Sequence, residues 1–178
     1  MRRGEVCGLP WSDADLGAGE LTVSRSRVPV GGEVIESTPK SGEPRSIMLD
    51  VDMVAVLKRH QKAQEAAQLK AGPKWRGAGN FIFTRVDGRP VEPNSVSREF
   101  RYAVVAPGLR AIRLHDLRHT HASLLLAGGE TVGNVSCRLG HADSRITQQV
   151  YEHCIPGAQR GTADHFQSIL RNAKNKAI

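Results

Sequence analysis

The spacing of apolar residues changes near residue 50, and this change constrains the fold more than any other feature of the chain. Between residues 21 and 49, apolar and polar residues alternate in "LTVSRSRVPV", "GEVIEST" and "RSIML", which "GG" and "KSGEP" interrupt. Alternation with a period of two, broken by turn residues, predicts three short antiparallel strands. Beyond residue 50 the apolar residues recur at helical spacing. The sequence therefore predicts an α+β fold that is mainly α, with a small three-stranded antiparallel sheet near the N-terminus.

Capping and breaking residues set the expected helix ends. Asp50 or Asp52 is expected to cap a helix that Gly72 ends, and Asn94 or Ser95 is expected to cap the next one. Further helices are expected at residues 1–9 and at about 115–127, 131–139, 143–152 and 159–173. A chain of 178 residues with this pattern is expected to form one domain.

Charge and cysteine content narrow the class of protein. The chain has 25 Lys and Arg against 18 Asp and Glu, a formal charge of +7. This excess favours a polyanionic partner, most simply nucleic acid, but charge alone also fits a basic protein without one. Cys7, Cys137 and Cys154 are scattered, which favours reduced thiols in a cytoplasmic protein. No apolar run approaches the roughly 20 residues that span a bilayer, and no signal peptide is evident, so we expect a soluble protein that is not exported.

The stretch "LHDLRHTHASLLL", residues 114–126, places several proton donors and acceptors at the start of an apolar helix. His115, Arg118 and His119 share one face at i, i+3 and i+4, while leucines such as Leu117 and Leu124 are expected to point into the core with Leu125. Arginine matches two phosphate oxygens, and histidine can move a proton near neutral pH. Taken alone, the same three residues also fit a solvated surface of the helix.

A second stretch, "LGHADSRITQQVYEH" at residues 139–153, adds a turn at Gly140, a further imidazole at His141 and a tyrosine at Tyr151. A phenol with a pKa near 10 attacks phosphorus only where cations stabilise the developing charge. Nearby histidine and arginine supply that setting. The other tyrosine, Tyr102, is expected on a helix surface or in packing.

The two stretches together, in this order and at this separation, resemble the catalytic domain of the tyrosine recombinases, the phage integrase family. "MRRGEVCGLPWSDADL" is similar to the family's GLRxGE-like segment, with Arg2 at the arginine position and Glu5 as its supporting carboxylate. "STPKSGEPRSIML" resembles the hairpin that carries a catalytic lysine, with Lys40 at that position. The catalytic set implied by the resemblance is Arg2, Lys40, His115, Arg118, His141 and Tyr151.

The resemblance implies a transesterification of DNA that needs no cofactor and no metal. Tyr151 would attack the scissile phosphodiester to form a 3′-phosphotyrosyl link and release a 5′-hydroxyl, and a second 5′-hydroxyl would reverse the step. Arg2 and Arg118 would clamp the non-bridging oxygens. The remaining roles fall to Lys40 as acid for the leaving oxygen, His115 as base or proton carrier, and His141 as hydrogen-bond donor; His119 and His121 are expected to be structural.

The resemblance also implies partners. The helix within "VEPNSVSREFRYAVV", residues 91–105, resembles the helix that meets the major groove in the family, so Ser97, Arg98 and Arg101 are candidate contacts to double-stranded DNA, although they also fit a solvated basic face. The tail, residues 155–178, has an apolar stripe that would dock on a neighbouring protomer of a homotetramer or pack on its own domain. Neither a membrane nor a small-molecule substrate is expected.

Family members are longer than this chain, and here Met1 directly precedes the Arg2 segment. We therefore expect residues 1–178 to be a catalytic domain that lacks the family's N-terminal DNA-binding domain. Three other hypotheses stay open: a DNA-binding module without chemistry, a DNA-relaxing enzyme like the type IB topoisomerases, and a zinc hydrolase. The last uses the i, i+4 spacing of His115 and His119, although Asp116 stands where a zinc hydrolase of the HExxH type has glutamate.

Overall fold

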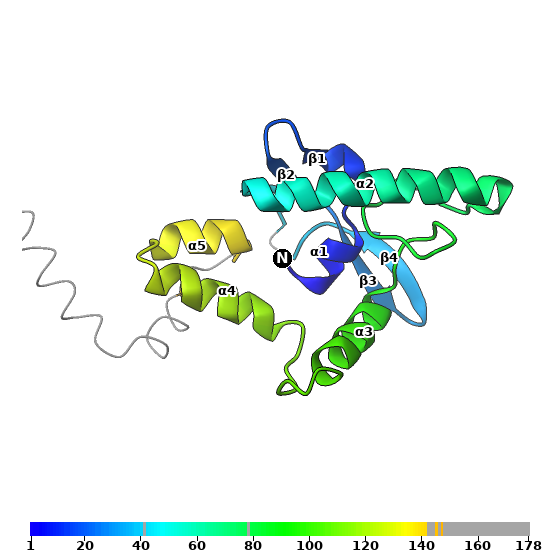
Figure 1. The fold of residues 1–178 in the computed structure, drawn as a ribbon. Helices are drawn as coiled ribbons and strands as arrows, with labels where there is room; N and C mark the ends of the chain where they lie inside the picture. The colour runs from blue at the N-terminus through cyan, green and yellow to red at the C-terminus, as the bar shows by residue number, and fades with distance from the viewer. Residues whose placement is uncertain (41, 78, 142–144, 146, 148–178) are drawn as a thin grey trace, which may run out of the picture.

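The computed structural model describes residues 1–40, 42–77 and 79–141, together with positions 145 and 147. Figure 1 shows the helix α1 at the centre with β3 and β4 beside it, the long helix α2 across the upper part with β1 and β2 above it, and the pair α4 and α5 at the left end. The mixed α+β architecture with small antiparallel sheets near the N-terminus confirms the predicted fold class. The helices are α1 (Arg3–Cys7), α2 (Val51–Ala71), α3 (Pro93–Val105), α4 (Asp116–Ala127) and α5 (Val132–Leu139), with 3-10 turns at Trp11–Asp13 and Gly72–Lys74.

The strands form two antiparallel sheets in place of the single sheet expected. One has the order β1-β2-β5, and the other is the hairpin β3–β4. The expected strand at residues 21–30 is interrupted between Val23 and Ser26. Leu21 belongs to the main core and Val23 is fully buried, whereas Ser26 lies against Gly4 of α1. The bounds are β1 (Ala14–Asp15), β2 (Glu20–Val23), β3 (Ser26–Val30), β4 (Glu33–Ser37) and β5 (Arg45–Met48).

The main core lies between the three-stranded sheet and α2. Leu21 and Leu57 are buried there with Trp11 and Ile82. The Asp50 side chain accepts a hydrogen bond from the backbone nitrogen of Met53, so Asp50 is the cap of the two residues that the sequence offered, Asp50 and Asp52. Gly72 ends α2 at a positive φ of 50°, a conformation that favours glycine.

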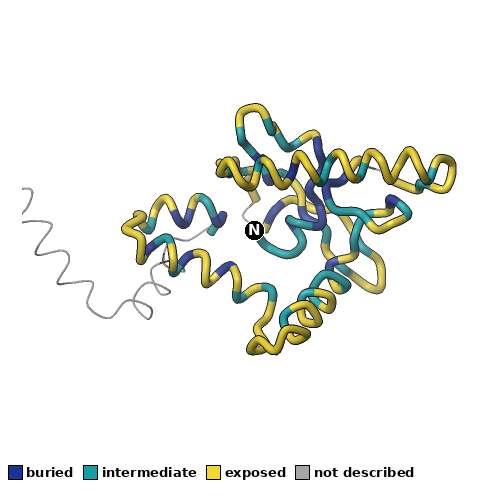
Figure 2. Tube along the Cα trace, viewed as in Figure 1, coloured by how far each residue is buried: buried dark blue, intermediate teal, exposed yellow. Residues whose placement is uncertain are grey.

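A second, smaller core lies between α4 and α5. The face of α4 that it buries differs from the face that the sequence predicted. Leu117 and Leu124 are 43% and 68% exposed, whereas Arg118, Ala122 and Leu126 form the buried stripe at i, i+4 and i+8. The alternation of buried and exposed positions along α4 is visible in Figure 2. Because α4 packs mainly on one partner helix, only one narrow stripe is covered, and that stripe includes an arginine.

The helix α3 begins earlier than predicted. Glu92 is its N-cap and Pro93 occupies the first turn, so neither Asn94 nor Ser95 is the cap. A proline fits this position because its missing N–H would have no helical partner there. The helices expected at 143–152 and 159–173, and the tail at 155–178, lie outside the described residues apart from positions 145 and 147. Among the helices that the structure describes, none has the length and apolarity required to cross a membrane.

Candidate active site

The site is built around a fully buried carboxylate at the start of the chain. Glu5, on α1, accepts hydrogen bonds from Arg45 at 3.0 and 2.7 Å and from the Arg2 side chain at 3.1 Å. The backbone nitrogen of Arg2 also donates to Glu5, at 2.7 Å. Burial alone would raise the pKa of the Glu5 carboxyl, but the hydrogen bonds from Arg45 and Arg2 outweigh it and hold the pKa below its ordinary value. Glu5 therefore stays ionised and fixes both guanidinium groups.

The same two arginines hold the C-terminal end of α5. Arg2 Nη2 donates to the carbonyl of Gly140 at 3.0 Å, and Arg45 Nε donates to the carbonyl of Arg138 at 3.3 Å. Gly140 ends α5 in the left-handed conformation, with a φ of 67°. A Cβ atom at this glycine would lie 2.7 Å from the Arg45 guanidinium. The network thus joins α1, β5 and α5 and places the residue after Gly140 next to Arg2.

Arg118 brings a further guanidinium to this site, from the buried stripe of α4. The residue is 5% exposed, and its buried Nη1 and Nη2 atoms have no hydrogen-bond partner among the described residues. Burial, followed by the nearby charge of Arg2, lowers the pKa of Arg118 to about 10. A buried cation without a partner is costly, and an anion in the adjacent space would satisfy it.

Three imidazoles accompany Arg118: His115 is the N-cap of α4, and His119 and His121 lie within the helix. The rings of His115 and His119 meet edge to face, with their centroids 5.0 Å apart. Burial and the nearby His119 and Arg118 lower the pKa of His115. His119, which the sequence led us to regard as structural, therefore lies within the cluster. His121 accepts a hydrogen bond from Arg138 Nε at 3.2 Å, which fits the structural role expected for it.

His141 follows the Gly140 turn and completes the cationic cluster. Its Nδ1 atom lies 2.7 Å from the Thr147 hydroxyl. Burial lowers the pKa of His141 to about 4, and the charges of Arg118 and Arg2 add to this effect. The imidazole is therefore neutral near pH 7 and can serve as a hydrogen-bond donor through one of its nitrogens.

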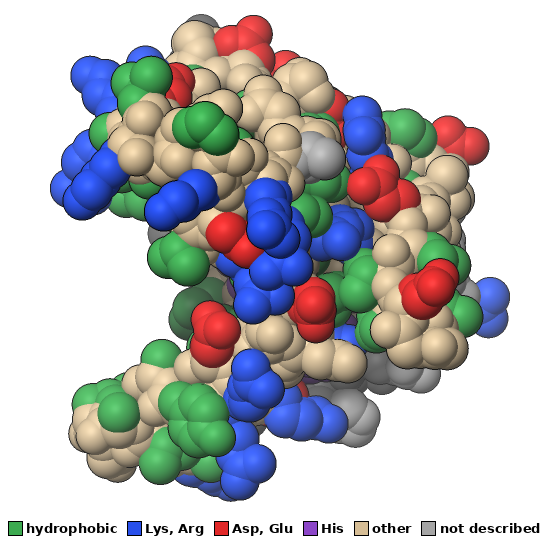
Figure 3. Space-filling view, turned by 90° about the vertical axis from the view of Figure 1, so that its right-hand side faces the viewer, with side chains coloured by type: hydrophobic (Ala, Val, Ile, Leu, Met, Phe, Trp, Pro, Cys, Tyr) green, Lys and Arg blue, Asp and Glu red, His purple; other side chains and the backbone are tan. Residues whose placement is uncertain are grey.

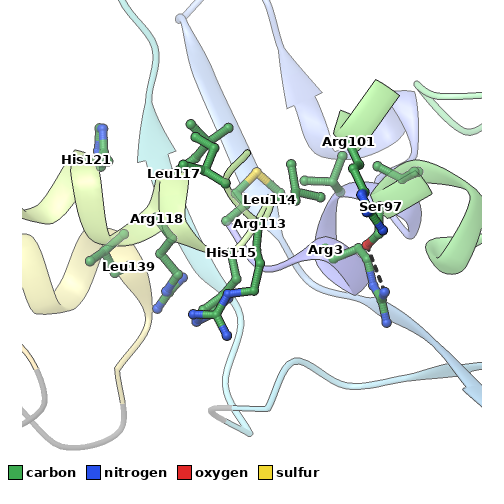
Figure 4. A pocket seen from close by; sticks show the side chains of 14 residues that line it. Arg3, Ser97, Arg101, Arg113, Leu114, His115, Leu117, Arg118, His121 and Leu139 are labelled. Atoms are coloured by element: carbon green, nitrogen blue, oxygen red, sulfur yellow. Dashed lines mark hydrogen bonds between the residues drawn. The ribbon is translucent and has the colours of Figure 1, made fainter. Parts of the chain in front are cut away.

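A pocket of about 730 Å³ opens beside Arg118, between α1, α3 and α4. Figure 4 shows that Arg113, His115 and Arg118 extend toward the same side of it, while His121 points away from them. Lys and Arg side chains also gather in the middle of the face that Figure 3 presents. The lining residues are Met1, Arg3, Val6, Val96, Ser97, Arg101, Ile112, Arg113, Leu114, His115, Leu117, Arg118, His121 and Leu139.

The three residues predicted to contact DNA lie on α3 beside this pocket. Ser97 accepts a hydrogen bond from Arg3 Nη1 at 2.9 Å, and Arg101 lines the same pocket. Arg98 lies in a neighbouring hollow that also contains Tyr102, which is 67% exposed and thus on the helix surface, one of its two expected places.

Two members of the predicted catalytic set are not joined to the cluster by the structure. Lys40 is exposed in the turn between β4 and β5, and its side chain has no hydrogen bond or ion pair to the described residues. Tyr151 lies outside the described residues. The structure thus brings together Arg2, His115, Arg118 and His141, and Glu5 binds Arg2.

Sequence reasoning missed Arg45 and Thr147. Arg45 pairs with Glu5 across 40 positions, and no local spacing signals such a contact. Thr147 lies six residues from His141 and is completely buried, but a lone threonine in a polar stretch carries no distinctive pattern. For the zinc hypothesis, we find no group of three His, Cys, Asp or Glu in the described part of the chain that could hold a metal ion.

Comparison with known proteins places this chain in a family. The model of the phage integrase family matches residues 1–156. The chain therefore belongs to this family, the tyrosine recombinases, as the sequence motifs indicated.

Two similar curated proteins are the ICEBs1 integrase of Bacillus subtilis, 32% identical over 171 residues, and a XerC-like tyrosine recombinase of Caldanaerobacter subterraneus, 29% identical over 182 residues. Each alignment covers 96% of this chain and 46% of the relative. The chain thus spans about half the length of these relatives.

Solved structures share the fold. The Tn1549 transposon integrase, in complex with transposon right end DNA, matches with a TM-score of 0.76 and 21% identity over 94% of this chain and 55% of that one. XerA recombinase matches with a TM-score of 0.68 and 21% identity, over 93% of this chain and 53% of that one.

Proposed function

We propose that this chain is the catalytic part of a DNA strand-exchange enzyme, which cleaves and rejoins DNA through a 3′-phosphotyrosyl intermediate. The observation that carries the proposal is the buried guanidinium of Arg118 beside Arg2, whose Nη1 and Nη2 atoms have no hydrogen-bond partner in the part of the chain that the structure describes. A phosphodiester carries the single negative charge and the paired oxygens that two arginines bind well. Family membership supports the same reaction.

In the proposed reaction, the Tyr151 oxygen attacks phosphorus as the bond to the 5′-oxygen breaks. The leaving oxygen takes a proton, for which Lys40 is the proposed donor, while His115 accepts or carries the phenol proton. Arg2 and Arg118 stabilise the charge on the non-bridging oxygens, usually the largest contribution in phosphoryl transfer. The new phosphotyrosyl ester conserves the bond energy, so a second 5′-hydroxyl can reverse the step without a nucleotide cofactor.

Double-stranded DNA is the proposed partner, held by the α3 surface that carries Ser97, Arg98 and Arg101. Arg3 supports this surface through its hydrogen bond to Ser97. We further propose that residues 1–178 form the catalytic domain, that the tail at 155–178 docks between protomers, and that a homotetramer assembles on DNA. The structure of the Tn1549 integrase with transposon end DNA lends support to the choice of DNA.

The test is formation of a denaturation-resistant adduct with supercoiled plasmid DNA. The intact chain should form the adduct, Tyr151→Phe should abolish it, and Tyr102→Phe should leave it unchanged, because only Tyr151 supplies the nucleophile. Arg118→Ala should also suppress it. An adduct that persists in Tyr151→Phe would refute the assignment of the nucleophile, whereas DNA binding without any adduct would favour a DNA-binding module. Plasmid relaxation without strand exchange between two sites would favour the topoisomerase-like reaction.

A further inference from the structure

We propose that Ser136 and Thr147 form a hydroxyl relay that sets the tautomer of His141, leaving its proton on Nε2. The two hydroxyl residues are positioning residues, since they act through His141. The role that we propose for this tautomer, a hydrogen bond from Nε2 to a phosphate oxygen, rests on the proposed function. The assignment of the tautomer does not depend on that function.

The relay is short and buried. Ser136, on α5, is 6% exposed, and Thr147 is completely buried. Ser136 Oγ donates to Thr147 Oγ1 at 2.6 Å, and the same Thr147 oxygen lies 2.7 Å from His141 Nδ1. With Ser136 as its donor, Thr147 keeps its own proton to donate to Nδ1. Because the two hydroxyls are buried away from water, no solvent competes for their protons, and the direction set at Ser136 is kept along the whole relay.

The direction of the relay determines which nitrogen of His141 carries the proton. A neutral imidazole has one N–H donor and one acceptor nitrogen, so Nδ1 as acceptor leaves the proton on Nε2. The unpartnered Arg118 supports this assignment. If Nε2 were a free acceptor in this cluster, a nearby guanidinium N–H would be expected to bind it, yet Nη1 and Nη2 of Arg118 have no partner among the described residues.

The charges around His141 keep it neutral. Arg118, Arg2, His119 and Arg45 all act against protonation of the ring, and burial acts in the same direction. A relay is therefore needed to present a donor, because a neutral ring offers a single N–H. The other tautomer would turn a lone pair toward the phosphate oxygens and repel them.

The direct test is the nitrogen chemical-shift pattern of His141 in the full chain with ¹⁵N-labelled histidine at pH 7. Long-range ¹H–¹⁵N correlation spectra distinguish a protonated from an unprotonated ring nitrogen. We expect Nε2 protonated in the native protein and in Thr147→Ser, which keeps the hydroxyl. Thr147→Val, which replaces the hydroxyl with a methyl group of similar size, should shift the equilibrium toward Nδ1–H. Thr120→Val is the matched control, because Thr120 donates to a backbone carbonyl in the exposed part of α4.

Two outcomes would overturn the relay: a proton on Nδ1 in the native protein, or an unchanged tautomer in a folded Thr147→Val variant. Should Thr147→Val fail to fold, Ser136→Ala tests the same relay from its other end and should raise the Nδ1–H population.

Adduct formation with plasmid DNA gives the second readout. Thr147→Val should lower its rate by at least about 10-fold, and by less than the roughly 100- to 1,000-fold expected when an oxyanion donor is lost altogether. Thr147→Ser should restore the rate. Absence of any adduct from the native chain would count against the proposed function, while the NMR result would still decide the relay.

Discussion

Glu5 is the residue on which the arrangement of the other site residues depends. Its carboxylate is fully buried and binds Arg2 and Arg45, which in turn hold the end of α5. Buried ion pairs of this kind contribute little net stability, but removing one partner leaves a buried charge uncompensated.

Glu5→Gln should therefore lower the free energy of unfolding by about 3–5 kcal/mol, the usual cost of breaking a buried pair. Urea denaturation at pH 7 would measure it. Glu36→Gln is the control, since the pair of Glu36 with Arg25 is about half exposed and 3.9 Å long. That control should cost at most about 1 kcal/mol. Equal losses in the two variants would contradict the central place of Glu5.

Whereas Glu5 stabilises the folded protein, Arg118 is expected to destabilise it. Its guanidinium is buried without a partner among the described residues, so its desolvation lowers the free energy of unfolding of the protein without DNA. Arg118→Met keeps an unbranched side chain and removes the charge. The free energy of unfolding should stay unchanged or rise, by up to about 3 kcal/mol.

The same variant should lose its response to phosphate. Inorganic phosphate at ten times its Kd should stabilise the native chain by about 1.4 kcal/mol and Arg118→Met by much less. Thermal unfolding at constant ionic strength, with and without phosphate, measures both effects. A strongly destabilised variant that phosphate still stabilises would argue against Arg118 as the anion site.

Among the elements, α5 is positioned by its C-terminal turn. The Gly140 carbonyl binds Arg2, and the space where a Cβ atom would lie is occupied by the guanidinium of Arg45. Arg45 cannot move aside freely, because Glu5 and the Arg138 carbonyl hold it.

Gly140→Ala should consequently cost more than backbone strain alone, about 2–4 kcal/mol in total. Gly31→Ala is matched in backbone conformation, with a φ of 58°, but its added methyl group meets nothing within 4 Å. The control should lose only the roughly 1–2 kcal/mol of the left-handed conformation. Chemical denaturation of both variants gives the difference, and similar losses would show that Arg45 yields easily.

The elements also show what the sequence could and could not predict. Local signals predicted a cap at Asp50 or Asp52, of which Asp50 is the observed one, and they predicted the stop at Gly72 and the span of α4 closely, because capping depends on neighbouring residues. The inward side of α4 was predicted incorrectly: three adjacent leucines gave several possible apolar faces, and the packing of α5 selected the one that includes Arg118. Arg2, His115, Arg118 and His141 were predicted from motifs, whereas the contact of Arg45 with Glu5 arises only when distant segments meet.

On the scale of the whole molecule, positive charge concentrates where the segments meet. The net charge of +7 includes Arg2, Arg45 and Arg118, which lie close together, and Glu5 is the one acidic side chain buried with them among the described residues. The fold therefore keeps nearby imidazoles from taking up protons. The pKa values of His115, His121 and His141 are all lowered, with burial as the first cause in each case.

The lowered pKa values of these histidines predict that the native state loses stability as the pH falls. The unfolded chain binds a proton at each histidine near pH 6.5, whereas folded His141 resists protonation until about pH 4. Stability contributed by neutral His141 is thus present above pH 6.5 and is lost progressively between pH 6.5 and pH 4. Because the ring is only partly buried, we expect its share of the loss to be about 1–2 kcal/mol, less than the full shift implies.

His141→Gln should flatten this part of the pH profile, since glutamine does not titrate. Urea midpoints measured at pH 7, 6 and 5 for the native chain and the variant would give the two slopes. The comparison rests on the slopes, because the variant also loses the hydrogen bond to Thr147 at every pH. Phosphate should flatten the native profile as well, since an anion beside Arg118 and Arg2 offsets the charges that oppose protonation of His141. If the urea midpoints of the native chain and of His141→Gln change in parallel with pH, the nearby arginines do not lower the pKa of His141.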